Sequence, residues 1–251
     1  MSAGKEALSG DVAAKLVSDL PALGRDSSRT YRLGVMGGTF DPIHNGHLVA
    51  ADQAAHDLKL DLVVFVPAGS PAFKQDRHVS SAEDRHAMTL LATADNPRFL
   101  VSRLEVDRPG ITYTVDTLEL LRNHYPNNVE IYFITGADAI SDILSWHDAD
   151  RIASLAHLVG ATRPGYDLEH ARASLAESGI RFLVHYLEVP ALAISSSDLR
   201  SRVAAGQSLR YLTSDSVVGY IEKRHLYDAA RAPYMAPDAL GLMGGMSTEG
   251  A

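Results

Sequence analysis

Apolar runs of strand length alternate with helical patterns through the middle of the chain. The runs are Tyr31 to Met36, Leu62 to Pro67, Phe99 to Leu104, Val129 to Thr135, His157 to Ala161 and Ile180 to Leu187. Helical patterns between them cover Asn45 to Leu58, Val115 to Asn123, Ala149 to Leu155 and Leu168 to Glu177. Ser80 and Glu83 predict a capping box for another helix, which extends to about Thr93. This alternation predicts an α/β fold, a doubly wound parallel sheet with crossover helices.

The two ends of the chain differ from this alternating region. Two helical patterns, Asp198 to Ala205 and Ser214 to Lys223, have no strand between them and predict a C-terminal helical segment. Residues 1–29 hold only a weak amphipathic pattern before Pro21, which predicts a flexible N-terminal extension. Residues 228–251 are rich in Ala, Gly, Pro, Met and Ser and predict a disordered C-terminal tail. We expect residues 30–227 to form one domain.

Composition narrows the class of protein. A hydrophobic content of 46% in 251 residues supplies a sizeable core. The formal charge of −8, with both signs mixed along the chain, argues against a nucleic-acid partner. The sequence has no cysteine, which excludes disulfides and thiolate chemistry, and no apolar run long enough to cross a bilayer. We therefore expect a cytoplasmic protein with no membrane partner.

A glycine-rich turn with two histidines follows the first strand. Open α/β sheets bind ligands at this place, beyond the carboxyl ends of their strands. Gly37 and Gly38 could simply form a tight turn, but glycines also let a phosphate approach the backbone. His44 and His47 are three residues apart at a predicted helix start, so both rings can face one phosphate, with Gly46 leaving space between them. Together these features favour a phosphate site over ordinary surface histidines.

A second candidate for phosphate binding lies near the end of the domain. Ser195 to Ser197 can cap a helix while its first amides and hydroxyls meet phosphate oxygens, and Arg200 adds a planar cation one turn later. Serines of this kind also occur as ordinary caps beside a surface arginine. The pairing with the first motif favours the phosphate role.

The two motifs resemble those of a known enzyme family. Gly37 to His47, GGTFDPIHNGH, resembles the HxGH signature of the nucleotidyltransferase superfamily, in the wording of bacterial nicotinate-nucleotide adenylyltransferases. Ile194 to Arg200 resembles the family's second motif, ISSxxxR. The resemblance covers about Tyr31 to Tyr227 and implies a Rossmann-like catalytic domain. It implies catalytic roles for His44, His47 and Arg200, and ATP contacts from Gly37, Gly38, Thr39, Phe40, Gly46, Ser195, Ser196 and Asp138.

Other candidate residues carry weaker signals. Asp138 follows a strand and could contact a ribose hydroxyl or cap a helix. Trp146, the only tryptophan, could pack in the core, although it lies in a stretch that resembles the family's pyridine-nucleotide segment. Lys74 in a loop and Thr114 before a helix are candidate mononucleotide contacts by the same resemblance. We expect the histidines in other helical patterns to lie on the surface: His56, His86 and His124.

The resemblance implies the reaction and its partners. The enzyme would join the adenylyl group of ATP to nicotinate mononucleotide, giving deamido-NAD and pyrophosphate, with Mg²⁺ arriving with ATP rather than in a protein metal site. Nicotinamide mononucleotide and phosphopantetheine are alternative acceptors, and a homo-oligomer is possible. From other classes, a metallohydrolase lacks a convincing ligand set around His44 and His47, a non-catalytic nucleotide binder would not need both motifs, and a redox protein would need G-x-G-x-x-G.

Overall fold

A parallel sheet forms the centre of the computed structural model, which describes residues 10–71, 79–162, 168–190 and 193–228. The six-stranded sheet has the order β4-β2-β1-β6-β7-β8, and every neighbouring pair is parallel. Its strands are β1 (Tyr31–Gly38), β2 (Leu62–Pro67), β4 (Phe99–Val101), β6 (Val129–Gly136), β7 (His157–Thr162) and β8 (Val184–Glu188). A separate parallel pair joins β3 (Ser70–Pro71) to β5 (Ile111–Thr112). The predicted doubly wound fold is confirmed.

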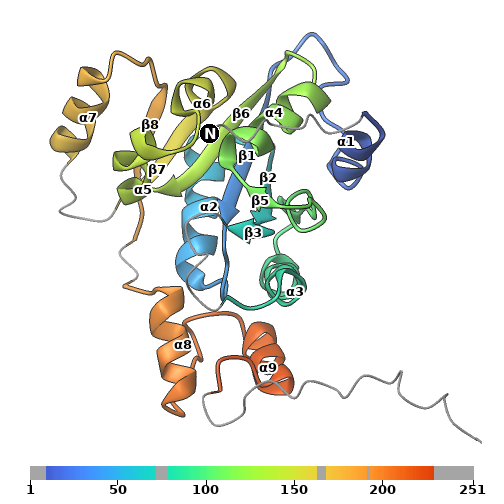
Figure 1. Ribbon diagram of the computed structural model, residues 1–251, viewed down its shortest axis with the longest axis vertical. Coiled ribbons are helices and arrows are strands. Elements are labelled where there is room, and N and C mark those ends of the chain that lie inside the picture. The colour runs from blue at the N-terminus through green and yellow to red at the C-terminus, as the bar shows by residue number, and fades with distance from the viewer. Residues whose placement is uncertain (1–9, 72–78, 163–167, 191–192, 229–251) are drawn as a thin grey trace, which may run out of the picture.

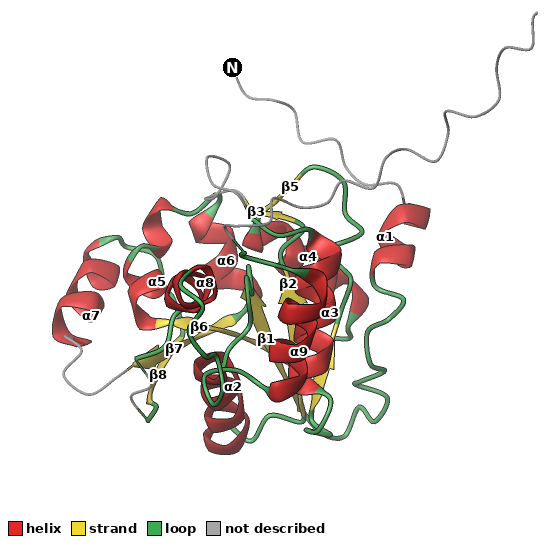
Figure 2. Cartoon of the chain, turned by 90° about the horizontal axis from the view of Figure 1, so that it is seen from below, coloured by secondary structure: helices red, strands yellow, loops and turns green. Residues whose placement is uncertain are grey.

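Helices cover both faces of the sheet (Figures 1 and 2). One core contains residues of α2 (Asn45–Asp57), α3 (Ala82–Thr93), α8 (Ser196–Ala204) and α9 (Asp215–Arg224). The other contains residues of α4 (Thr114–His124), α5 (Ala137–Ser141), the 3-10 turn η2 (Ile143–Ser145), α6 (Ala149–Leu155) and α7 (Leu168–Glu177). In β2, Val63 and Phe65 belong to the first core and Val64 and Val66 to the second. Burial on both faces explains why the strands are continuous apolar runs.

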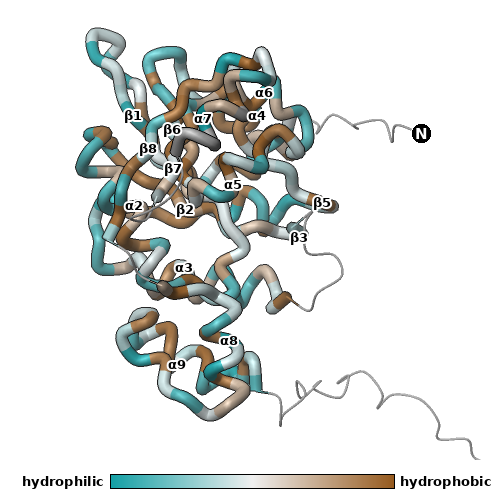
Figure 3. The backbone as a smooth tube through the Cα atoms, turned by 90° about the vertical axis from the view of Figure 1, so that its left-hand side faces the viewer, coloured by the Kyte–Doolittle hydropathy of each residue, from teal (hydrophilic) through white to brown (hydrophobic). Residues whose placement is uncertain are grey.

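The central strands are mainly hydrophobic, and the outer loops are mainly hydrophilic (Figure 3). The C-terminal helices α8 and α9 lie together at one end of the molecule in Figure 1. Tyr220 of α9 donates its hydroxyl to Asp84 of α3 at 2.9 Å, and Arg224 reaches the same carboxylate oxygen at 3.2 Å. These contacts attach the C-terminal helical segment to the main domain. No helix of the described residues is long and apolar enough to span a membrane.

The segment before the sheet also contacts the domain. It includes the short helix α1 (Gly10–Leu16), and Leu16 and Val17 are buried. Asp19 accepts hydrogen bonds from the hydroxyl of Ser102 at 2.8 Å and the backbone N–H of Arg103 at 2.7 Å. The hydroxyl of Tyr125 donates to the carbonyl of Pro21 at 2.9 Å. A domain boundary at residue 30 stays a prediction, and these contacts argue for an earlier one. The predicted tail lies outside the described residues, except Asp228.

Two strands are shorter than predicted. β4 ends at Val101 rather than Leu104, because the next backbone amide beyond Ser102, that of Arg103, is bound by Asp19 rather than by a neighbouring strand. β8 begins at Val184 rather than Ile180, since the N–H of Ile180 is bound by the Ser178 hydroxyl.

The predicted helix cap is displaced by one residue. Ser81, not Ser80, caps α3, and its hydroxyl accepts from the N–H of Asp84 at 3.0 Å. Ser80 has other partners, because its carbonyl accepts from Arg85 and its N–H approaches Asp41.

Candidate active site

The site lies where the strand order reverses direction. The chain runs outward from β1 to β2 and β4 on one side and from β6 to β7 and β8 on the other, so the carboxyl ends of β1 and β6 form a topological switch point. Open α/β sheets bind ligands at such points. Two cavities meet there, and both are lined by Gly37 of β1 and Thr135 of β6.

The first of these, the histidine cavity, has a volume of about 350 Å³. Five residues expected in the site line it: Gly37, His44, Gly46, His47 and Asp138. Asp138 lies in the first turn of α5, directly after β6. The volume is within the range of about 300 to 1,000 Å³ that is typical of small-molecule sites.

The two histidines form one unit at the start of α2. His44 is the N-cap residue, and its backbone N–H donates to Nδ1 of His47 at 3.2 Å. In its neutral form, a His47 ring that accepts at Nδ1 carries its proton on Nε2. That N–H is a hydrogen-bond donor.

Burial changes the charge of His44. The residue is 7% exposed, and burial lowers the pKa of its imidazole from 6.5 to about 4. His44 is therefore neutral at pH 7. It can act on a phosphate as a hydrogen-bond donor but not as a cation.

Gly46 and Phe40 hold the histidine rings in place. A Cβ atom on residue 46 would lie 3.1 Å from Nδ1 of His44, so glycine leaves room for that ring. Phe40 was expected to contact ATP, but its side chain is buried in the core. Its ring meets that of His47 edge-on at 5.1 Å between centroids. Phe40 therefore packs against the ring of His47.

Side chains from three other segments bind the carbonyl groups of the loop between β1 and α2. Arg85 of α3 donates to the carbonyl of Thr39 at 2.9 Å, and Thr213, before α9, donates to that of Ile43 at 2.9 Å. The two remaining bonds come from the second motif, with Arg200 on the carbonyl of Asp41 at 2.7 Å and Ser196 on that of Pro42 at 2.9 Å. The loop that carries the histidines is thus fixed from outside the cavity.

The second motif therefore has a contact that the sequence did not predict. Ser195 caps α8 as expected, since its hydroxyl accepts from the N–H of Asp198 at 3.1 Å. Ser196 and Arg200 were expected to face phosphates, which stays a prediction, and their hydrogen bonds also hold the first motif. Arg200 uses Nη1 for the Asp41 carbonyl and Nη2 for the Ser197 hydroxyl at 3.2 Å. The two motifs are joined directly, on the outer side of one loop.

The other cavity, which we call the tryptophan cavity, has a volume of about 170 Å³. Gly38, Thr39, Thr114 and Trp146 line it. Its volume is below the range that holds a drug-sized ligand, so it fits one part of a nucleotide, such as its base. Trp146 meets Phe133 edge-on, at 6.1 Å between ring centroids, so it both packs on the sheet and faces the cavity.

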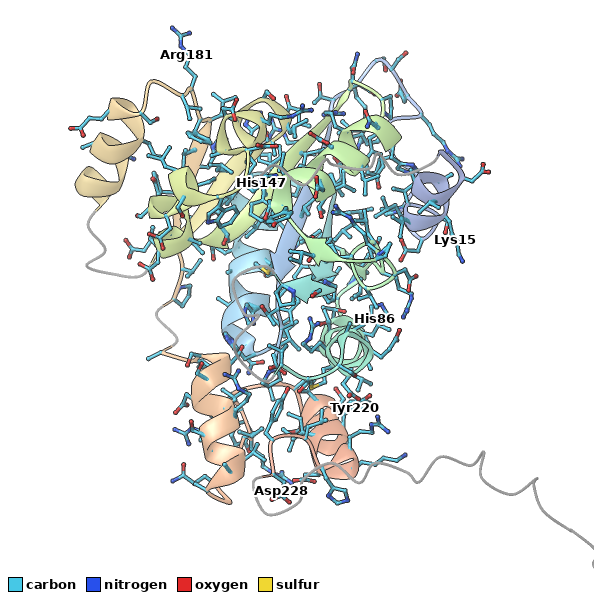
Figure 4. The ribbon with its side chains drawn as sticks, in the orientation of Figure 1. Lys15, His86, His147, Arg181, Tyr220 and Asp228 are labelled. Carbon is cyan, nitrogen blue, oxygen red and sulfur yellow. The ribbon has the colours of Figure 1, made fainter. Side chains whose placement is uncertain are left out.

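Several lining residues were not predicted. His147 lies near the centre of the molecule (Figure 4), and its ring is 4.5 Å from that of Tyr113. Glu105 is buried in the wall of the tryptophan cavity and accepts from the hydroxyl of Thr117 at 2.6 Å. Burial raises the pKa of its carboxyl group. The neighbouring Trp146 could have indicated His147, but no spacing in the sequence indicates Glu105.

His86 was expected on the surface, but it is 8% exposed, and burial lowers its pKa. It lies on the side of α3 that packs against the domain, a side that helical periodicity alone did not identify. Lys74 lies outside the described residues.

The metallohydrolase alternative gains no support from the part of the chain that the structure describes. Within that part there is no group of three or more His, Cys, Asp or Glu side chains that could hold a metal ion. His44 and His47 therefore have no third protein ligand among those residues.

The sequence of the chain is similar to those of known proteins. The Cytidylyltransferase-like family matches residues 35–202. A relative from Frankia alni, named "Probable nicotinate-nucleotide adenylyltransferase", is 57% identical over 194 residues, which are 77% of this chain and 99% of that protein. A relative of the same name from Streptomyces coelicolor is 56% identical over 192 residues, 76% of this chain and 98% of that protein.

A solved structure shares the fold. It is that of Plasmodium falciparum nicotinic acid mononucleotide adenylyltransferase complexed with NaAD, and its TM-score to this chain is 0.65. The two are 20% identical in sequence, and the match covers 78% of this chain and 97% of the other.

Proposed function

This chain belongs to the Cytidylyltransferase-like family, among relatives named nicotinate-nucleotide adenylyltransferase, and we propose that it transfers the adenylyl group of ATP to nicotinate mononucleotide. The products are deamido-NAD and pyrophosphate, in the biosynthesis of NAD. The observation that best supports this proposal is that the second motif is hydrogen-bonded directly to the loop of the first, through Arg200 and Ser196. That attachment gathers the histidine pair and the second motif at one switch point.

The chemistry requires orientation and neutralisation rather than a protein nucleophile. The 5′-phosphate of the acceptor attacks the α-phosphorus of ATP, a new P–O bond forms, and the bond to the pyrophosphate oxygen breaks. A phosphate monoester is largely dianionic at pH 7, because its second pKa is about 6, so no general base is needed. His44 and His47 donate hydrogen bonds to the α-phosphate as its charge shifts.

The second motif serves the leaving group. The Arg200 guanidinium donates a hydrogen bond to the loop, and its remaining N–H groups can bind the β- and γ-phosphates. Ser195 and Ser196, at the start of α8, can contribute there too. Gly37, Gly38, Gly46 and the backbone around Thr39 and Phe40 let phosphates approach the loop, and Asp138 can accept from the ribose of ATP.

A divalent ion, Mg²⁺ in our proposal, fits this arrangement when it arrives with ATP. Phosphate oxygens and water supply most ligands of such ions in nucleotide sites, and no metal-ligating cluster is present in the described part of the chain to hold one independently. The ion would neutralise phosphate charge. We propose no protein ligand for it.

We assign the tryptophan cavity to the pyridine end of the acceptor. Trp146 lines this cavity, and so does Thr114, the first residue of α4. Lys74 stays a candidate contact for the acceptor phosphate. We also propose a cytoplasmic enzyme with no nucleic-acid or membrane partner, and a homo-oligomer remains compatible with these features.

A pyrophosphate-release assay tests the proposed function. The purified chain is given ATP and Mg²⁺ with nicotinate mononucleotide, nicotinamide mononucleotide or phosphopantetheine, each in a separate reaction. We expect the highest kcat/KM with nicotinate mononucleotide, and deamido-NAD as its product. Equal or higher kcat/KM with the amide would contradict the proposed acceptor. Absence of pyrophosphate release with all three would contradict adenylyl transfer.

A further inference from the structure

Arg85 of α3 is a buried arginine that joins three separate segments. It is 1% exposed. Its Nε donates to the carbonyl of Ser80 at 3.0 Å, Nη1 to that of Thr39 at 2.9 Å, and Nη2 to that of Gly69 at 2.9 Å. The rigid fork of a guanidinium can bind several carbonyls in fixed directions, which a single ammonium cannot do.

Two of the three partners belong to the walls of the site. Thr39 lines the tryptophan cavity and begins the loop that leads to the histidine pair. Gly69 follows Ala68 and precedes the short strand β3, and both Ala68 and Pro71 line the tryptophan cavity. A Cβ atom on residue 69 would lie 2.0 Å from the carbonyl oxygen of Glu105, so this segment is packed tightly on the opposite side. Arg85 thus connects the loop that leads to the histidine pair with a second segment in the wall of the tryptophan cavity.

Burial lowers the pKa of the Arg85 guanidinium, and carboxyl groups of the protein partly oppose this shift. The carboxyl groups of Asp41 and Glu105 both act on it electrostatically. Asp41 is itself held by the hydroxyl of Tyr227 at 2.7 Å. Removing a guanidinium from water is costly, and packed apolar side chains commonly serve stability as well or better. Its hydrogen bonds to the two substrate loops suggest a role beyond stability.

We propose that Arg85 is a positioning residue. It fixes the separation between the loop that leads to the histidine pair and the segment around Gly69 in the wall of the tryptophan cavity. The inference rests on the proposed adenylyl transfer, in which a phosphate bound in one region must attack a phosphorus bound in the other. Arg85 touches neither substrate. It acts through Thr39 and Gly69, so its loss should misalign the reactants while each substrate still binds its own wall.

The expected effect is on the chemical step. Displacing reacting groups by about 1 Å can cost about 10²-fold in rate. Arg85→Lys keeps the charge but cannot hold all three carbonyls. We expect the single-turnover rate of pyrophosphate release to fall about 10²-fold, while the Kd of a non-hydrolysable ATP analogue and that of nicotinate mononucleotide each change less than about threefold.

Arg122 provides the matched control. Its guanidinium also donates to backbone carbonyls, those of Val129 at 2.8 Å and Pro126 at 2.9 Å, but at the amino end of β6, away from the site. We expect Arg122→Lys to lower the Tm without lowering the single-turnover rate more than about threefold. A rate loss in Arg85→Lys no greater than in Arg122→Lys would overturn the proposal. Equally, a loss confined to substrate binding would overturn it.

Hydrogen exchange on the wild-type chain gives a test that needs no substitution. Because Arg85 joins the loops, the ATP analogue alone should slow amide exchange at Gly69 and Ser80 as well as around His44. Protection confined to residues 37–47 would contradict the proposal, even if Arg85→Lys failed to fold. A wild-type chain that releases no pyrophosphate would instead overturn the proposed function, so the two failures are distinguishable.

Discussion

The imidazole rings of His44 and His47 are stacked, with centroids 3.7 Å apart and 24° between their planes. The stack follows from the three-residue spacing at the start of α2, together with the hydrogen bond from the His44 backbone to the His47 ring. Both residues line the same cavity. One phosphate group can meet both, which is the geometry that stabilisation of a transferring phosphoryl group requires.

Replacing His47 with alanine should mainly affect kcat. The substitution removes a donor whose interaction is stronger in the transition state than in the ground state. By analogy with one oxyanion-hole donor, kcat should fall about 10²- to 10³-fold. Steady-state kinetics with ATP and nicotinate mononucleotide would measure this. His56→Ala, on the exposed side of the same helix, is the control. An unchanged kcat with intact ATP binding would make the histidine a ground-state contact only.

Arg200→Ala should differ from His47→Ala in kind. The phosphates that Arg200 would bind are charged before and after transfer, so the KM for ATP should rise, with a smaller loss in kcat. The structure adds a cost in stability, because Arg200 also donates to the carbonyl of Asp41. A charged hydrogen bond of this kind contributes about 2 kcal/mol, so the free energy of unfolding in urea should fall by about that amount. Loss of stability alone, with an unchanged KM, would limit Arg200 to bracing the loop.

The strands and the first motif could be predicted because each is determined by residues that are close together in the sequence. An apolar run buried on two faces is visible in the sequence, as is a glycine pair before two spaced histidines. Contacts between distant segments are different. Nothing in the helical pattern around Arg85 indicates that its side chain reaches the carbonyls of Thr39 and Gly69, and nothing in ISSxxxR indicates that Arg200 binds the backbone of Asp41.

Contacts between distant residues also decide whether a segment with a weak sequence pattern packs on the domain. The pattern around α1 is poor, yet Asp19 is fixed by Ser102 and Arg103. The burial of His86 has the same origin, since helical periodicity gives a face but not its neighbour.

A chain that begins at residue 30 should be less stable than one that begins at residue 10. It loses the buried side chains of Leu16 and Val17 and the hydrogen bonds of Asp19. Burial of one such side chain is worth about 1.5 to 3 kcal/mol, so a net loss of about 3 kcal/mol and a Tm lower by about 10 °C are expected. Thermal unfolding of both chains, with Asp19→Asn in the longer one, would measure this. Equal Tm values would support a boundary at residue 30.

Stability should depend on pH through His44. Its pKa is about 4 in the folded chain and 6.5 as an ordinary histidine, so between these values the unfolded chain binds a proton that the folded chain does not. Stability must therefore rise with pH in this window, is fully present above about pH 6.5, and is lost as pH falls towards 4. A difference of this size corresponds to about 3 kcal/mol.

The comparison of wild type with His44→Gln isolates this contribution. His86 and His185 have pKa values lowered in the same direction, but both remain in the variant and cancel in the difference. Urea unfolding at pH 7.0 and pH 4.5 should show that the wild type loses about 2 to 3 kcal/mol more than His44→Gln between the two values. Equal losses would mean that His44 titrates normally in the folded chain. In that case it could be charged when it meets a phosphate, and its role as a neutral donor would have to be abandoned.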